Sequence, residues 1–258
     1  MFRHLLKALV STFALALLAA CASQQIPEGT ITQAGCFESF AAGNFTGATS
    51  ISRLSDGAEI GLGTFDAVDG ELIILDGEAY RGAFDGTVTK VDGSLKTPFA
   101  VSSKAKADFV VKLENGMSSK AVSAAIDKAV GQPGAFLAIK AKVRFATLTL
   151  RAPPPAQSPK DTLVSVIARQ KVFKLKDVSG VLIGFRTPAA YKGLNVPGYH
   201  FHFISDDRKA GGHVLGFSVA EGSAGVQICK ELLLIAPPDA PDFKGSQDSG
   251  VKGESAGH

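Results

Sequence analysis

The stretch Gly198-Tyr199-His200-Phe201-His202-Phe203-Ile204-Ser205 decides the fold, because its histidines alternate with aromatic residues. Alternate residues of a β-strand face the same side, so a strand here projects His200 and His202 from one face. The segment Ser205–Gly212 that follows is polar and glycine-rich, which predicts a turn. We therefore expect His213 to return on an adjacent strand and to meet the other two imidazoles.

Three converging histidines predict a metal site. Neutral imidazole nitrogens bind zinc at about 2.0–2.1 Å, and three of them leave coordination positions open to water or substrate, as in catalytic zinc sites. Nitrogen ligands alone do not fix the element, so iron, manganese, nickel and copper are alternatives to Zn²⁺. The other interpretation is that His200, His202 and His213 are hydrogen-bonded core or surface residues.

Outside this stretch the chain also reads mostly as strands. From Gly61 to Gly93, glycine and aspartate separate short apolar runs, a pattern typical of hairpins. The best helix pattern covers Ser118–Val130, with Ser118 or Ser119 as N-cap, and a weaker one covers Lys160–Arg169. Later apolar runs predict strands at residues 181–185, 200–204, 214–219 and 231–235. The predicted fold class is α+β and strand-rich, with two packed mixed or antiparallel β-sheet units and few helices.

The order of these elements predicts two domains. Residues 36–140 would form an N-terminal β-rich domain and residues 141–243 a C-terminal metal-binding β-rich domain. Residues 244–258, rich in Gly, Ser and Lys, would form a flexible tail. A faint likeness between residues 61–73 and 182–201 makes an ancient duplication one interpretation, and chance similarity the other.

Composition limits the function classes. With 258 residues, 45% hydrophobic and 20% charged, the chain has ample material for a core, which excludes disordered, collagen-like and disulfide-dense proteins. The formal charge of +3 includes Arg3 and Lys7 at the N-terminus; without them 25 basic residues face 24 acidic ones. This balance gives no argument for a nucleic-acid partner.

The first twenty residues read as an export signal. A short basic region with Arg3 and Lys7 precedes the apolar run Ala8–Ala20, which is too short to span a bilayer. The sequence Leu18-Ala19-Ala20-Cys21 resembles a bacterial lipobox, in which Cys21 is acylated and residues 21–35 serve as a tether. We therefore expect a periplasmic or cell-surface lipoprotein that contacts the membrane only through its lipid. A chance cysteine after a plain cleavage site is the alternative.

The remaining two cysteines are Cys36 and Cys229. An oxidising compartment permits them to pair, which would tie the start of the folded region to a late strand. Two separate buried thiols are the other interpretation, because the sequence gives no distance between them.

Longer motifs in the sequence resemble a known family. The stretch from Gly61 to Leu72, GLGTFDAVDGEL, is similar to the N-terminal half of bacterial alpha-acetolactate decarboxylases. The second half of that family is matched by GFRTP at residues 184–188, GLNVPGYHFHFIS at 193–205 and GGHVL at 211–215. The resemblance covers roughly Cys36 to Phe243.

This resemblance implies a zinc-dependent enzyme that converts 2-acetolactate to acetoin and CO₂. The family motifs place metal ligands at His200, His202 and His213, catalytic residues at Glu71 and Arg151, and a substrate-proximal threonine at Thr64. The family also has an acidic residue near its C-terminus, for which Glu254 is the late glutamate available. Without the family, Glu71 would read as a solvated hairpin carboxylate and Arg151 as a surface base.

The implied chemistry suits these residue types. Loss of CO₂ leaves an enediolate, whose negative charge a bound metal and the Arg151 guanidinium can stabilise. Glu71 is then the candidate proton donor to the enediolate. The runner-up function is a lipoprotein on the same scaffold that binds metal or a small hydroxy-keto acid without turnover or with altered specificity. A homodimer is one alternative for the oligomeric state.

Overall fold

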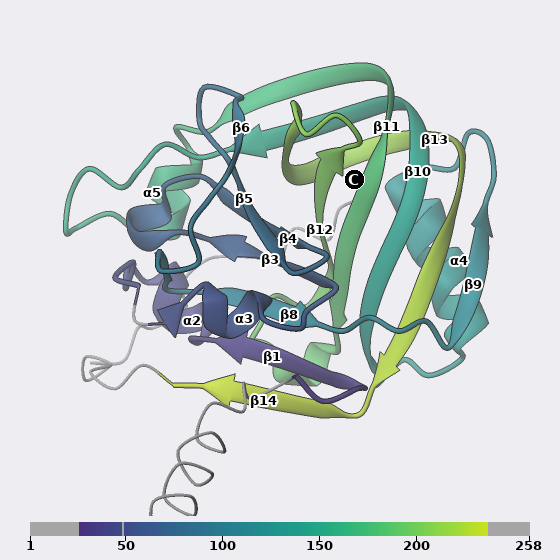
Figure 1. Ribbon diagram of the computed structural model, residues 1–258, viewed down its shortest axis with the longest axis horizontal. Helices are drawn as coiled ribbons and strands as arrows, with labels where there is room; N and C mark the ends of the chain where they lie inside the picture. Colours follow the sequence, from purple (N-terminus) through teal and green to yellow (C-terminus); the bar gives the residue numbers. More distant parts are fainter. Residues whose placement is uncertain (1–25, 48, 237–258) are drawn as a thin grey trace, which may run out of the picture.

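The computed structural model describes residues 26–47 and 49–236. The described residues form a seven-stranded sheet, a five-stranded sheet and a small two-stranded one, so the strand-rich α+β class is confirmed (Figure 1). The predicted signal peptide, Cys21, the tail and Glu254 lie outside the described residues. Among the described helices, none is long and apolar enough to cross a membrane.

The first sheet has the strand order β14-β1-β8-β3-β4-β5-β6. Its strands are β1 (Thr30–Ala34), β3 (Ile60–Thr64), β4 (Glu71–Leu75), β5 (Glu78–Gly82), β6 (Val88–Lys90), β8 (Ala100–Ser103) and β14 (Glu231–Ile235). Only the β1–β14 pair is parallel; the other neighbours in this sheet are antiparallel. The small sheet pairs β2 (Thr49–Ser50) with β7 (Lys96–Thr97).

The second sheet has the order β10-β11-β12-β13-β9, and β10 also pairs with β13. Its strands are β9 (Phe109–Leu113), β10 (Phe136–Ala152), β11 (Lys171–Thr187), β12 (Gly198–Ser205) and β13 (Gly211–Cys229). Because β10 bonds to both β11 and β13, these four strands close into a ring. All of these pairings are antiparallel.

The predicted main helix is confirmed to within one residue as α4 (Ser119–Val130). Ser118 caps it by accepting a hydrogen bond from the Ala121 amide, and Gly131 ends it at a φ of 64°, where glycine is favoured. The weaker helix, predicted over Lys160–Arg169, is present but shorter, as α5 (Leu163–Ile167). The other helical segments are α2 (Phe37–Ala41), α3 (Ser52–Ser55) and the 3₁₀ turns η2 (Asp66–Val68) and η3 (Ala189–Tyr191).

The predicted domain boundary at residues 140/141 does not follow the fold, because it falls inside the single strand β10. Elements on each side of this boundary also belong to the sheet of the other side. β9 and α4 precede the boundary but pack with the second sheet, whereas β14 follows it and pairs with β1 in the first sheet. A strand takes its main-chain partners from wherever they lie along the chain. The faint repeat falls on two antiparallel pairs, β3–β4 and β11–β12, and a duplication stays a prediction.

Two hydrophobic clusters position the site. One fills the second sheet and its contact with α4, and includes Phe145, Phe203 and Ile126. The other joins the two sheets through buried residues such as Ile73 of β4 and Ile204 of β12. Burying side chains of this size stabilises the fold by about 1.5–3 kcal/mol each. This second cluster brings β4 against β12, the strand with two of the three histidines.

The considered disulfide between Cys36 and Cys229 is not formed, since both are free thiols. The Cys36 thiol donates to the carbonyl oxygen of Gly193 at 3.0 Å. Cys229 is buried at the end of β13, and burial raises the pKa of its thiol to about 12. The two thiols are therefore separate, as the alternative had it, but only Cys229 is buried; Cys36 is half-buried.

Candidate functional site

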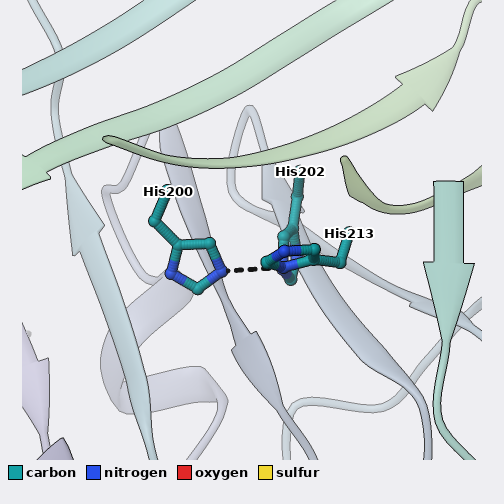
Figure 2. A group of neighbouring side chains, drawn as sticks. All are labelled: His200, His202 and His213. Carbon is teal, nitrogen blue, oxygen red and sulfur yellow. Dashed lines mark hydrogen bonds between the residues drawn. The ribbon is translucent and has the colours of Figure 1, made fainter. Parts of the chain in front are cut away.

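The three histidines meet as their spacing predicted. His200 and His202 lie on β12, and His202 is in register with His213 on β13. Their candidate ligand nitrogens all lie within 4.8 Å of one another, and Figure 2 shows the three rings gathered together. The ring nitrogens His200 Nε2 and His213 Nδ1 are 3.0 Å apart. The turn of residues 206–210 brings them together from two neighbouring strands.

His202 is held in one tautomer. Its Nδ1 lies 2.8 Å from the carbonyl oxygen of Leu72, which can only accept, so Nδ1 carries the proton and Nε2 the lone pair. His202 is fully buried, and among the described residues its Nε2 has no hydrogen-bond partner. A buried, unpaired imidazole lone pair next to two further imidazoles fits a metal ion. The donor set therefore fits the group that the sequence predicted.

Burial also sets the charge of these rings. It lowers the pKa of His202 to about 3, although the bond to Leu72 opposes the shift, and the positive charge of Arg151 lowers the pKa further. Burial likewise lowers the pKa values of His200 and His213 well below the ordinary value, with smaller contributions from Arg151 and the neighbouring rings. Neutral imidazole is the form that binds metals.

Glu71 is the first residue of β4, and its side chain points toward the histidine cluster. It is 8% exposed, so the interpretation as a solvated hairpin carboxylate is wrong. Its Oε2 lies 3.3 Å from His202 Nε2, close to the ring but not in hydrogen-bonding geometry. Burial raises the pKa of Glu71 to about 7, and the charge of Arg151 only partly offsets the shift. Strand β4 thus supplies a buried carboxyl from Glu71 and a carbonyl from Leu72.

Arg151 lies opposite His213 in the β10–β13 ladder. Directly opposite residues on neighbouring strands project from the same face, so Arg151 faces the site. Its charge lowers the pKa values of Glu71 and of the three histidines, which places it within electrostatic range of all four. Arg151 is half-buried and faces the site, so the interpretation as a surface base is wrong.

Comparison with known proteins identifies the family. The family model described as "Alpha-acetolactate decarboxylase" matches residues 31–247. The chain belongs to the alpha-acetolactate decarboxylase family. The relative from Methanosarcina mazei is 35% identical over 211 residues, covering 82% of this chain and 73% of the relative. The relative from Bacillus subtilis is 30% identical over 223 residues, covering 86% and 88%.

Solved structures agree with this family assignment. The crystal structure of alpha-acetolactate decarboxylase from Bacillus subtilis strain 168 matches with a TM-score of 0.80 at 30% identity, over 85% of this chain and 94% of that one. A Staphylococcus aureus protein, described as of unknown function and similar to the decarboxylase, matches with a TM-score of 0.81 at 29% identity, over 88% and 98%. The fold is thus shared along most of each chain.

Thr64, the substrate-proximal threonine of the decarboxylase resemblance, lies beside Glu71 in the β3–β4 ladder. It is 5% exposed, and its hydroxyl donates to the carbonyl oxygen of Gly70 at 2.7 Å. This bond closes the turn that precedes Glu71. In that turn Ala67 and Val68 have φ values of 56° and 60°, a strained conformation for side chains of this kind.

Loops on both sides hold this strained turn. The Ala67 amide donates to the carbonyl oxygen of Phe45 at 2.9 Å, and the Ala67 carbonyl oxygen accepts from the Ala156 amide at 2.8 Å. Ala156 belongs to the proline-rich loop that follows Arg151, so one loop connects the positions of the acid and the guanidinium. Sequence reasoning missed this connection and the Leu72 carbonyl, because main-chain contacts leave no residue-type signal.

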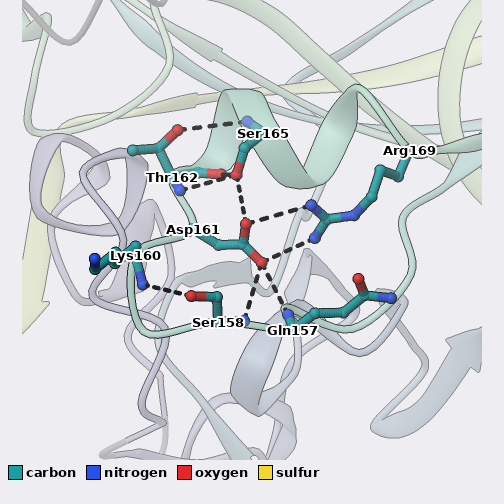
Figure 3. Close-up of polar contacts among 7 residues, drawn as sticks. All are labelled: Gln157, Ser158, Lys160, Asp161, Thr162, Ser165 and Arg169. Atoms are coloured by element: carbon teal, nitrogen blue, oxygen red, sulfur yellow. Dashed lines mark hydrogen bonds and ion pairs between the residues drawn. The ribbon is translucent and has the colours of Figure 1, made fainter.

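The rest of that loop is organised by Asp161 (Figure 3). The carboxylate accepts from the main-chain amides of Gln157 and Ser158, from the hydroxyl of Ser165 and from both terminal nitrogens of Arg169. Arg169 and the other donors hold the pKa of Asp161 far below its usual range. The acid predicted at Glu254 lies outside the described residues and stays a prediction.

Proposed function

We propose that this protein decarboxylates 2-acetolactate to acetoin and carbon dioxide in a metal-dependent reaction. The observation that carries the proposal is the convergence of three neutral histidines with the buried carboxyl of Glu71, whose Oε2 is 3.3 Å from His202 Nε2. Membership of the alpha-acetolactate decarboxylase family supports the reaction.

Zn²⁺ is the proposed metal, held by His200, His202 and His213. When bound, a divalent metal of this kind supplies Lewis-acid stabilisation for the negative charge that develops as CO₂ leaves. The other divalent transition metals that nitrogen ligands accept are alternatives which metal analysis of the purified protein separates.

Glu71 would protonate the enediolate that remains after CO₂ is lost. The carboxyl is buried, so it is shielded from bulk water, and it lies beside the histidine cluster where the substrate would sit. Its burial favours the protonated form over the form an exposed glutamate adopts. A general acid needs both this position and a proton to give.

Arg151 would bind the substrate carboxylate and then the enediolate oxygens. Its guanidinium keeps its positive charge at any physiological pH, so it stabilises negative charge without taking part in proton transfer. The register with His213 places it next to the cluster.

Thr64 would contact the substrate through its remaining hydrogen-bonding capacity. Because its proton is donated to Gly70, its oxygen can only accept, and the substrate hydroxyl is a matching donor. Glu254 is proposed as a further acid of the site on the strength of the sequence resemblance alone.

Purified protein with zinc, incubated with 2-acetolactate, should produce acetoin and CO₂, measured against the same protein treated with a chelator. Production that is equal with and without metal would contradict metal dependence. A protein that binds zinc through the histidines but forms no acetoin would instead be a binding lipoprotein on this scaffold.

Export through the signal peptide and anchoring by a lipid on Cys21 are also proposals, and they rest on residues 1–21. Cys21→Ser should abolish incorporation of labelled fatty acid and release the protein from the membrane fraction. Membrane attachment that survives the substitution contradicts the anchor. A homodimer is proposed as the oligomeric state, and the mass from sedimentation equilibrium decides between it and a monomer.

A further inference from the structure

The loop that enters β12 is held by a buried pair of amide side chains. Asn195 donates through Nδ2 to Gln33 Oε1 at 2.7 Å, and its own Oδ1 accepts from the Val196 amide at 2.6 Å. Gln33 in turn donates through Nε2 to the carbonyl oxygens of Leu194 and Gly35, at 2.7 and 2.9 Å. Asn195 is 5% exposed and Gln33 is fully buried.

Main-chain hydrogen bonds also join this loop to the residues that follow β1. The amides of Phe37 and Glu38 donate to the carbonyl oxygens of Leu194 and Gly193. Gly193 has a φ of 90°, and a Cβ added there would lie 3.1 Å from Glu38 Oε2, so a side chain at this position would be strained. Residues 193–195 are thus anchored to Gln33 in β1 and to the segment that follows this strand, more than 150 positions earlier in the chain.

This anchor matters for His200 because of how β12 is paired. Along its whole length β12 bonds to β11, but only His202–Ile204 also bond to β13. His200 therefore lies in the half of the strand that has a ladder partner on one side only. His202 has a second support in the hydrogen bond from its Nδ1 to the carbonyl oxygen of Leu72. The His200 ring packs against the His202 and His213 rings, and the hydrogen bond found for it among the described residues is to His213, itself a member of the cluster.

We infer that Asn195 and Gln33 are positioning residues that hold the entrance of β12 so that His200 stays aligned with His202 and His213 for metal binding. This inference rests on the proposed function insofar as the histidines hold the metal. Neither amide belongs to the histidine cluster. Residues that hydrogen-bond directly to a metal ligand typically change metal affinity by about 10–100-fold when they are replaced. Asn195 and Gln33 act on His200 through the strand, so we expect an effect at the lower end of this range.

Asn195→Ala removes the donor to Gln33 and the acceptor of the Val196 amide. Asn195→Asp keeps that acceptor but replaces the donor with a carboxylate oxygen, which repels the Gln33 Oε1 it faces. A matched control is Ser103→Ala on β8, which removes a buried hydrogen bond of 3.0 Å from the Ser103 hydroxyl to the carbonyl oxygen of Thr30. Thr30 lies on the same strand as Gln33, but this bond is away from the β12 loop. Thermal melts of the metal-free proteins show how much each change costs in stability.

The test is titration of full-length protein with Co²⁺, whose visible spectrum reports the number and geometry of its ligands. At a temperature below the melting temperature measured for each variant, Asn195→Ala should bind Co²⁺ about 10-fold more weakly, with an altered spectrum. Asn195→Asp should also bind it more weakly than the parent, because the carboxylate repels Gln33 Oε1. Ser103→Ala should match the parent in both. Double replacement of Asn195 and Gln33 by Ala should weaken binding by less than the two single replacements combined, because the two side chains share one hydrogen bond.

Parental affinity and spectrum in Asn195→Ala overturn the inference, as does an equal loss in Ser103→Ala, which would make the amide pair a stabilising contact only. A parent protein that binds no Co²⁺ also overturns it. A parent that binds Co²⁺ but forms no acetoin overturns the proposed function and leaves the positioning result standing, so the two failures are distinguishable.

Discussion

The carbonyl oxygen of Leu72 accepts a hydrogen bond from His202 Nδ1 at 2.8 Å, across 130 positions of sequence and between the two large sheets. The bond leaves the Nε2 lone pair of His202 facing the other histidines. Because Leu72 directly follows Glu71, the same short strand orients a metal ligand and presents an acid. The relative position of the ligand and the acid therefore depends on the packing of β4 against β12.

Replacing His202 by Ala should abolish tight zinc binding and activity together, because two imidazoles remain and the aligned lone pair is lost. His200→Ala and His213→Ala should behave similarly. Metal content per chain, measured by atomic absorption, checks this expectation. Tyr199→Phe is the control on the same strand: it loses the hydrogen bond from its hydroxyl to Asp127 at 2.7 Å but should keep its zinc. Near-full occupancy in all three histidine variants would contradict the assignment.

Glu71→Gln should retain zinc and lose on the order of a hundredfold or more in kcat, because the amide keeps the size of the side chain but has no proton to transfer. Steady-state acetoin formation and metal analysis on the same preparation check both parts. Glu78→Gln on the neighbouring strand β5 is the matched control, since that carboxylate pairs with Lys90 at the surface and should be dispensable. Equal activity in Glu71→Gln and the parent would remove Glu71 from the chemical step.

Arg151→Lys should bind zinc normally but turn over more slowly and with a higher KM. The ammonium keeps the charge but not the planar pair of donors that a carboxylate or enediolate accepts. Arg144→Lys is a control on the same strand, because Arg144 makes an exposed ion pair with Asp177. The expectation fails if the two lysine variants have the same kinetic constants.

The histidine cluster could be predicted from sequence because period-two spacing at His200 and His202, followed by a polar turn, leaves few other arrangements. The helix α4 was equally readable, since Ser118 and Gly131 mark both of its ends. These features depend on residues close together in sequence. Local pattern was sufficient for them.

What the sequence did not reveal depends on long-range main-chain bonds. Nothing in the residues 231–235 indicates that they pair in parallel with β1, or that β10 closes a ring with β13. Lys140 and Ala141, on either side of the expected domain boundary, are consecutive residues of one continuous strand. The roles of Glu71 and Arg151 came from the family motifs, because burial of a lone carboxyl or guanidinium is decided by partners elsewhere in the chain.

Asp161 gives a prediction about acid stability. Arg169 and the other donors lower the pKa of this carboxyl below the value of about 3.9 expected in an unfolded chain. The stability that this difference contributes is present above about pH 4 and is lost as pH falls toward the folded-state pKa. Metal-free Asp161→Asn should therefore melt at a lower temperature than the parent at pH 7, and the gap should narrow between about pH 4 and pH 2.

Melting curves followed by circular dichroism across this pH range, with a chelator present, check the expectation. Arg169→Gln should show the same narrowing, because it removes the main cause of the lowered pKa of Asp161. Ser165→Ala keeps the charges of Asp161 and Arg169, so its melting temperature should follow that of the parent more closely as pH changes. If the Asp161→Asn curve also ran parallel to the parent, the charge of Asp161 would contribute nothing, and the loop after Arg151 would be held by its main-chain bonds, such as that between Ala156 and Ala67.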